Sequence, residues 1–340
     1  MQLNNKYVFS SLIQFYEIGM FNEHIQSLIQ MTEPITNKQN ITIDLCFNFQ
    51  QKFEKIDWYK FYEQHGNGRV FINEYYGFIL FKEQFGKIWG KLPSELDVKI
   101  SYIFDDVPFY NIAHSRRDIC WKYTNTHDFI CWNEVDSLWP KQTLFALETL
   151  HEQVSGQYPK YVANFAGRKN WDKSWDVITH PLFESIPYQD DENWIFNNPA
   201  SEKSYMSLEQ MNEINNISPD KIQVQALTEP KADGSCLVFT SELLKSGVTL
   251  PHSLIHHGED ESILRIAKRI MGDDFVQFNF KNILRVHNRR HPQKRKFILN
   301  EDNPTGICNA EKKGNWWVEL EEKSKHNLET LFKQVKSKSL

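Results

Sequence analysis

Apolar runs and helix-spaced apolar positions alternate over the first fifty residues of the chain. The run YVFSSLIQFY at 7–16 predicts a buried strand, and ITIDLCFNF at 41–49 predicts a second one. Between them, the apolar positions of 21–31 recur at helical spacing. A strand, a helix and a second strand within so short a stretch predict a βαβ unit, which is the usual opening of a parallel sheet.

The rest of the chain continues this alternation with less regularity. Apolar runs predict further strands at 98–104, 129–132, 222–227, 235–239 and 275–280. Helical periodicity predicts helices at 58–64, 109–124, 141–153, 241–246 and 261–271, and a charged helix that ends near 336. The pattern at 70–85 fits either element, and the looser segment 158–216 predicts a long elaboration over one face of the sheet. We therefore expect an α/β fold with a mostly parallel sheet flanked by helices.

Composition narrows the classes of protein that this pattern allows. The 340 residues are 40% hydrophobic and 14% aromatic, which suits one large or two ordinary packed domains and excludes general disorder. The net charge of −5 excludes a molecule that attracts nucleic acid over its whole surface. The five cysteines are scattered, so we expect neither a disulfide framework nor a zinc site. Because no apolar run approaches ~18 residues, we expect a cytoplasmic protein without an integral membrane segment.

Two carboxylates lie at the end of one predicted strand. The run DFICWNEVDSLWP at 128–140 passes from apolar residues into Glu134 and Asp136. Open α/β sheets bind their ligands at the carboxyl ends of the strands. Carboxylate oxygens there suit Mg²⁺ or Mn²⁺, which typically sit between one or two carboxylates and a substrate diphosphate. A solvated acidic turn has the same sequence pattern, so the pair needs support from elsewhere in the chain.

Two later features supply that support. Gly258-Glu259-Asp260 precedes a predicted helix, and His287 lies in a segment dense in Lys and Arg. In this order, after a βαβ opening, these features resemble the GT-A fold glycosyltransferases, in particular family 2 of that group. The resemblance covers the layout of residues 7–296 and is specific at a few positions. It implies the GT-A fold and a metal-dependent transfer of sugar from a nucleoside diphosphate sugar to an acceptor hydroxyl.

The resemblance implies roles for the acidic residues and the histidine. Glu134 and Asp136 correspond to the family's Asp-x-Asp metal motif, with Glu in place of the first Asp, and His287 corresponds to a late histidine that completes the metal site. The implied cofactor is Mn²⁺ or Mg²⁺, bound together with a UDP-sugar. Asp260 is the first candidate, and Glu259 the second, for the general base that deprotonates the acceptor. Taken alone, the same segment is more typical of a helix N-cap than of a catalytic base.

The resemblance also implies where the donor binds. The nucleoside is expected at the ends of the first two strands, and the phosphates are expected near basic side chains. The expected donor-binding residues are Gln14, Phe15, Tyr16, Asn48, Asp106, Arg116, Arg117, Arg289 and Arg290. Six Lys and Arg residues lie between 285 and 296. These cations could neutralise the departing nucleoside diphosphate.

We expect three parts in the chain: a nucleotide-sugar-binding half at 1–140, an acceptor-binding and catalytic half at 141–296, and a C-terminal helical tail at 297–340. Acceptor specificity is expected in the Trp-rich elaboration, because aromatic rings stack on sugars and on extruded bases alike. The basic segment, and a Lys-, Asn- and aromatic-rich style similar to that of phage proteins, favour a hydroxymethylated pyrimidine in DNA as acceptor. A cell-surface glycan or a lipid-linked sugar is the alternative.

Two other classes of protein stay open. A sugar nucleotidyltransferase uses a related sheet, but it usually carries a glycine-rich basic loop after the first strand, where this chain has Gln14-Phe15-Tyr16. A non-catalytic binder of nucleotide sugars is the second alternative. No P-loop, dinucleotide-binding glycine motif or serine-nucleophile motif is present.

Overall fold

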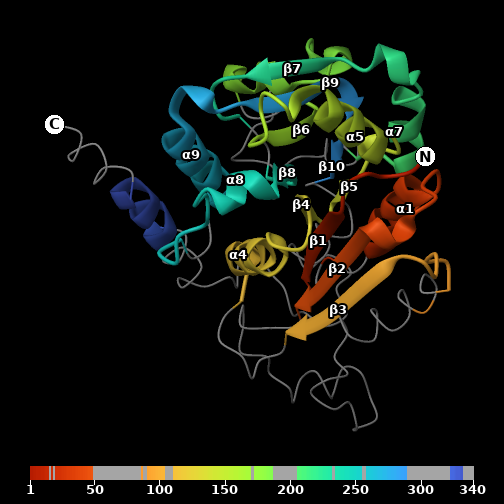
Figure 1. The fold of residues 1–340 in the computed structure, drawn as a ribbon, viewed down its shortest axis with the longest axis horizontal. Coiled ribbons are helices and arrows are strands. Elements are labelled where there is room, and N and C mark those ends of the chain that lie inside the picture. The colour runs from red at the N-terminus through yellow and green to blue at the C-terminus, as the bar shows by residue number, and fades with distance from the viewer. Residues whose placement is uncertain are drawn as a thin grey trace, which may run out of the picture.

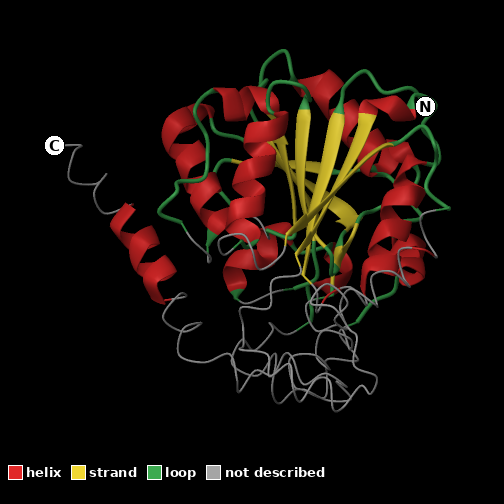
Figure 2. Ribbon diagram, turned by 90° about the horizontal axis from the view of Figure 1, so that it is seen from below, coloured by secondary structure: helices red, strands yellow, loops and turns green. Residues whose placement is uncertain are grey.

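One large sheet runs through the described part of the chain (Figure 1). The computed structural model describes residues 1–14, 17, 20–48, 86, 90–103, 110–169, 172–186, 205–231, 234–254, 258–288 and 322–331. Helices lie on both sides of the sheet (Figure 2), so the mixed α/β fold with flanking helices is confirmed. The elements predicted at 58–64 and 70–85 fall outside the described residues.

The strands of this sheet are β1 (Tyr7–Gln14), β2 (Ile41–Asn48), β3 (Asp97–Ile103), β4 (Phe129–Glu134), β6 (Val162–Ala166), β7 (Val224–Leu227), β8 (Cys236–Thr240) and β9 (Gln277–Leu284). Within the described residues their order is β3-β2-β1-β4-β8-β6-β9-β7. Parallel pairings join β1 with β2 and with β4, β2 with β3, and β6 with β9. Strand β8 runs antiparallel to β4 and β6, and β7 runs antiparallel to β9. The predicted parallel opening is therefore confirmed, and the sheet continues across the boundary expected at residue 140.

Strand β6 (Val162–Ala166) corrects the prediction that 158–216 is an elaboration throughout. All five of its residues are buried, and it pairs with both β8 and β9 in the interior of the sheet. Helix α7 (Leu208–Ile214) lies in the same segment and begins with a capping box from Ser207 and Gln210. The strand was missed because its apolar run is short and is followed by a stretch rich in Trp and Pro.

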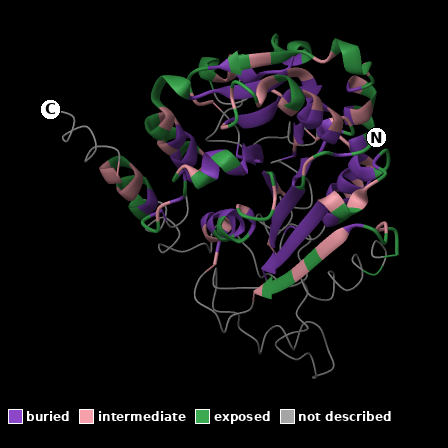
Figure 3. Cartoon of the chain, in the orientation of Figure 1, coloured by how far each residue is buried: buried purple, intermediate pink, exposed green. Residues whose placement is uncertain are grey.

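Two apolar layers cover the two faces of the sheet. Helices α1 (Phe21–Thr32) and α5 (Thr143–Val154) pack with side chains such as Phe9 from one face of β1. Helices α4 (Ile112–Tyr123), α8 (Ser241–Lys245) and α9 (Glu259–Met271) pack with Val8 from the other face. Central strands are consequently buried along their length, as parallel strands usually are, whereas the edge strand β3 is partly exposed (Figure 3).

The parallel strands bring three predicted site residues to one edge of the sheet. Gln14, the last residue of β1, lies opposite Asn48, the last residue of β2. Glu134 ends β4 and lies opposite Leu12 in β1. Beyond this edge the chain forms a small ribbon in which β5 (Ser137–Leu138) pairs antiparallel with β10 (Val286–His287). The C-terminal part of the chain thus returns to the end of β4.

The described helix at 322–331 lies against the same side of the fold as α9. The Asn327 side chain donates a hydrogen bond to the Ser253 carbonyl at 2.7 Å, and Leu328 packs beside the apolar cluster of α9. A side chain added at Gly258, which has a φ of +78°, would come within 3.0 Å of Leu328. In the described part of the chain we find no helix with both the length and the apolar character needed to cross a membrane.

Candidate functional site

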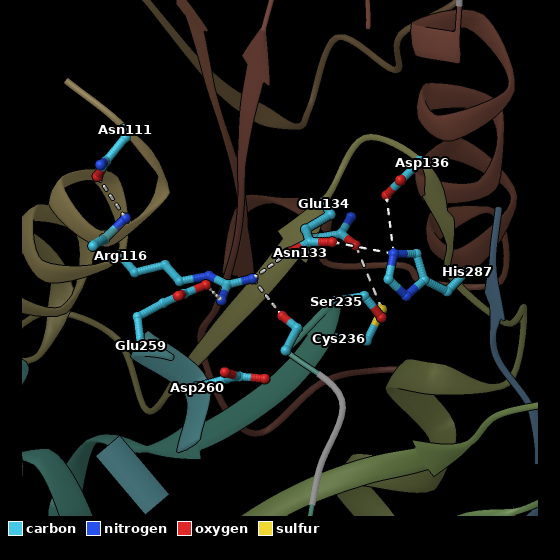
Figure 4. Close-up of polar contacts among 12 residues, drawn as sticks. Asn111, Arg116, Asn133, Glu134, Asp136, Ser235, Cys236, Glu259, Asp260 and His287 are labelled. Atoms are coloured by element: carbon cyan, nitrogen blue, oxygen red, sulfur yellow. Dashed lines mark hydrogen bonds and ion pairs between the residues drawn. The ribbon is translucent and has the colours of Figure 1, made fainter. Parts of the chain in front are cut away.

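Glu134, Asp136 and His287 converge beyond the end of β4 (Figure 4). One potential ligand atom from each lies within 4.8 Å of the other two. His287 Nε2 is 3.2 Å from Glu134 Oε2 and 3.4 Å from Asp136 Oδ1. Asp136 is 3% exposed, whereas the side chain of Glu134 is 30% exposed. The structure therefore brings together the three residues predicted to bind a metal.

The β5–β10 ribbon is what carries His287 to the two carboxylates. In its register, His287 lies opposite Ser137, the residue directly after Asp136. The Asn288 amide donates a further hydrogen bond to the Asp136 carbonyl at 2.6 Å. Backbone pairing therefore fixes the positions of both Asp136 and His287, although 150 residues separate them in the sequence.

The donor set fits a divalent cation. Ligand atoms at neighbouring positions of an octahedral ion with bonds of ~2.1 Å lie roughly 3 Å apart, which is close to both histidine–carboxylate separations. Two carboxylates and one imidazole form a mixed oxygen and nitrogen set, which suits Mn²⁺ better than the harder Mg²⁺. The partly exposed side of Glu134 leaves the cluster open to a ligand.

Arg116 of α4 connects this cluster to the start of α9. Its guanidinium pairs with Glu134 Oε1 at 3.0 Å and with Glu259 Oε1 at 2.5 Å, and it also donates to the Gly234 carbonyl. The same group lies 5.0 Å from the centre of the Trp132 ring. Arg116 is 3% exposed, so its charge interacts with the surrounding carboxylates rather than with solvent. Arg116, predicted to bind the donor, thus lies between two carboxylates of the protein.

Glu134 is held in its charged form. Burial by itself would raise its pKa, but the hydrogen bond from His287 and the charge of Arg116 outweigh burial and lower the pKa. One carboxylate oxygen faces Arg116 and the other faces His287. The second oxygen is therefore the one that belongs to the candidate metal set.

Glu259 and Asp260 have different surroundings at the start of α9. Glu259 is 7% exposed and points to Arg116, and burial raises its pKa to about 7 although Arg116 opposes the rise. Asp260 is partly exposed and packs against Gly234, where an added Cβ would lie 2.7 Å from Asp260 Oδ2. Gly234 precedes Ser235, whose carbonyl accepts from the Glu134 amide. Asp260 therefore lies beside the segment that borders the metal cluster.

A buried polar network lies beneath the cluster. His24 of α1 is fully buried and contacts the Ser137 carbonyl through Nδ1 at 2.8 Å. Its Nε2 faces the Ser11 hydroxyl at 2.9 Å and the Asn133 amide at 3.3 Å. Sequence reasoning missed His24 because it shares the apolar face of α1. The signal that could have identified His24 is the presence of a polar residue on the helix face that has to be buried.

The other predicted donor-binding residues are placed as follows. Gln14 and Asn48 lie together at the sheet edge, and the Asn48 side chain donates to the Tyr110 carbonyl at 2.9 Å. Arg117 is not brought to the cluster, because its guanidinium donates to the carbonyls of residues 250, 251 and 254. Outside the described residues lie Phe15, Tyr16, Asp106, Arg289 and Arg290.

The chain is similar to several solved structures at low sequence identity. No protein-family model matches the chain, and no curated protein matches it. Among solved structures, Staphylococcus aureus TarS 1–349 is 10% identical with a TM-score of 0.41, and the match covers 84% of this chain and 58% of that one. Mycobacterium tuberculosis glucosyl-3-phosphoglycerate synthase with Mn²⁺, UDP and glucosyl-3-phosphoglycerate is 11% identical with a TM-score of 0.37, covering 90% and 82%.

A third solved structure, the Streptococcus pneumoniae glycosyltransferase GlyE, is 10% identical with a TM-score of 0.32, covering 81% of this chain and 45% of that one. The chain thus spans little more than half the length of the TarS fragment. Similarity at this level does not show the activity, which has to be inferred from the residues of this chain.

Proposed function

We propose that this protein is a metal-dependent glycosyltransferase that moves a sugar from a nucleoside diphosphate sugar, of the UDP type, to an acceptor hydroxyl. The observation that carries the proposal is the convergence of Glu134, Asp136 and His287 at the carboxyl edge of a parallel sheet. Ligands bind at this edge in open α/β sheets. A divalent cation held there would supply positive charge to the diphosphate, which becomes more negative as it leaves.

The end of β1 supports a nucleoside beside the metal cluster. Gln14 Oε1 is buried and has no hydrogen-bond partner in the described part of the chain. A buried acceptor of this kind costs free energy unless a ligand satisfies it. The imide N–H of a uracil base is a donor of the right kind. This orphaned oxygen, next to Asn48 at the same edge, favours a uridine nucleotide.

Asp260 is the residue that we propose as general base. It lies beside the segment bordering the metal cluster, and it is partly exposed, whereas Glu259 is engaged with Arg116. In the proposed step the acceptor hydroxyl gives its proton to the Asp260 carboxylate. The acceptor oxygen forms a bond to the anomeric carbon of the sugar, and the bond from that carbon to the diphosphate oxygen breaks. The electron pair of the broken bond leaves with the nucleoside diphosphate.

The identity of the acceptor is the more specific part of the proposal. The expectation of a hydroxymethylated pyrimidine in DNA depended on the basic segment 285–296. Arg285 is 3% exposed and donates to the Ser235 hydroxyl, so it does not present its charge on the surface. The Lys and Arg residues at 289–296 lie outside the described residues. We therefore propose an acceptor hydroxyl, with modified DNA and a glycan or lipid-linked sugar as the two classes to test.

Release of UDP from a panel of UDP-sugars tests the proposal. We expect release that stops when EDTA removes the metal and returns with added Mn²⁺. Asp136→Asn should abolish it, and Asp260→Asn should abolish transfer to an acceptor while leaving UDP binding intact. Turnover that is the same with and without EDTA would contradict the proposal. Consumption of UTP and a sugar phosphate with release of pyrophosphate would favour a nucleotidyltransferase instead, and UDP binding without turnover of any donor would favour a non-catalytic binder.

A further inference from the structure

Strand β5, which carries the residue after Asp136, has an edge that β10 does not cover. On its β10 side, Ser137 and Leu138 lie opposite His287 and Val286. On the side of α1, the Ser137 carbonyl contacts His24 Nδ1 at 2.8 Å, and the Trp139 amide donates to the Ser27 hydroxyl at 3.1 Å. Two side chains one turn apart on α1 thus take the place of a neighbouring strand.

Only one tautomer of the neutral His24 ring satisfies all of its hydrogen bonds. A carbonyl oxygen can only accept, so Nδ1 must donate to Ser137, and Nε2 of the neutral ring accepts from the Ser11 hydroxyl and the Asn133 amide. The ring is completely buried, and burial lowers its pKa to about 4, so it is neutral at physiological pH. One rigid ring therefore connects β1, the end of β4 and β5.

The charges around this network show why such a connection is needed. The carboxylates of Glu134 and Asp136 both face His287, and two like charges held close together repel each other. The corner between β4 and β5 contains both residues, and His24 contacts it on each side, through Asn133 before Glu134 and through Ser137 after Asp136. Holding the Asn133 side chain on one side and the Ser137 backbone on the other limits how far the carboxylates can separate.

We infer that His24, assisted by Ser27, is a positioning residue that holds the β4–β5 corner so that Glu134 and Asp136 face His287 in the arrangement that binds a divalent cation. The inference rests on the metal site of the proposed function. His24 touches neither the cation nor its ligands, and it acts through the backbone of Ser137 and the side chain of Asn133. Partners that orient metal ligands typically contribute ~10- to 100-fold to metal affinity, and the lower end is expected for an indirect contact.

Binding of Mn²⁺ to the full chain without nucleotide tests the inference, followed by the electron paramagnetic resonance signal of free Mn²⁺. His24→Leu removes all three ring contacts, whereas His24→Asn keeps a donor near the Nδ1 position. We expect the dissociation constant to rise about 10-fold in His24→Leu and by less in His24→Asn. Ser27→Ala, which removes the acceptor for Trp139, should also weaken binding and gives a second variant if His24→Leu does not fold.

Thr32→Val is the matched control. Thr32 is fully buried on the same helix, and its hydroxyl donates to the Ile29 carbonyl, away from the β4–β5 corner. It should lower the free energy of unfolding and leave the Mn²⁺ dissociation constant unchanged. An unchanged dissociation constant in His24→Leu, or in Ser27→Ala if His24→Leu does not fold, or an equal change in Thr32→Val, would overturn the inference. If the wild type and Asp136→Asn bind Mn²⁺ equally, the proposed metal site itself fails.

Discussion

Replacing Arg116 with methionine removes one buried charge and leaves two carboxylates without their common partner. Methionine keeps much of the aliphatic stem, so the variant mainly deletes the guanidinium and its contacts. Glu259 and Glu134 would lose the cation that lies 2.5 and 3.0 Å from them, and the Gly234 carbonyl would lose a donor. Because Arg116 is 3% exposed, water does not replace these contacts easily.

Removing one partner of a buried ion pair typically costs about 3 to 5 kcal/mol. Glu259 is nearly as buried as Arg116, so this range applies to their pair, whereas Glu134 is 30% exposed and adds less. We therefore expect Arg116→Met to lower the free energy of unfolding by about 3 to 5 kcal/mol. Combining it with Glu259→Gln should recover part of the loss, because the amide is neutral without taking up a proton, whereas Glu259 without Arg116 must be protonated at pH 7 or stay buried as an unpaired charge.

Urea denaturation at pH 7, followed by tryptophan fluorescence and circular dichroism, measures both effects in a double-mutant cycle. Arg265→Met is the matched control, because Arg265 pairs with Glu261 on the exposed side of α9 and is about half exposed. That exposed pair should contribute no more than ~0.5 kcal/mol. A loss in Arg116→Met no larger than in the control, or additive effects in the cycle, would refute the reasoning.

Three further predictions concern Glu259, Gly234 and Glu148. The pKa of Glu259 is raised to about 7 from 4.5, so the folded state keeps a proton that the unfolded state releases. The contribution of Glu259 to stability is therefore full below pH 4.5 and is lost as the pH rises through 7. Glu259→Gln should flatten that part of a plot of unfolding free energy against pH, and an unchanged slope would refute it. Gly234→Ala places a Cβ 2.7 to 2.9 Å from Asp260 atoms, so kcat for transfer should fall roughly 10- to 100-fold with Mn²⁺ binding unchanged. Glu148, which is 2% exposed, accepts from the Tyr7 hydroxyl and from the amides of residues 4 and 5, so Glu148→Gln should lower the unfolding free energy in urea by about 2 kcal/mol without changing metal affinity.

The opening of the sheet could be predicted from the sequence because local patterns determine it. Strands β1 and β2 are mostly apolar stretches of eight residues, and α1 between them has clear helical spacing. Strand β6 has a run of only five residues, and what makes it a central strand is its pairing with β8 and β9, which are distant in the sequence. Such pairing leaves no local signal.

The candidate site was predictable only in part for a related reason. Glu134 and Asp136 follow directly from the end of a strand, but the two-residue strands β5 and β10 that bring His287 to them have no recognisable pattern. Arg116 and Arg117 were both predicted to bind the donor. Neighbouring residues point about 100° apart on a helix, and here one guanidinium reaches the site while the other reaches the carbonyls of 250–254.

In the proposed function, Glu134, Asp136 and His287 hold a metal that in turn holds a nucleoside diphosphate. Isothermal titration of UDP into the protein with and without Mn²⁺, repeated for Mn²⁺ with and without UDP, measures the coupling between the two ligands. We expect each ligand to raise the affinity of the other by the same factor, at least ~10-fold, and Asp136→Asn to remove this coupling. UDP binding that is equally tight with and without Mn²⁺, or coupling that survives in Asp136→Asn, would contradict it.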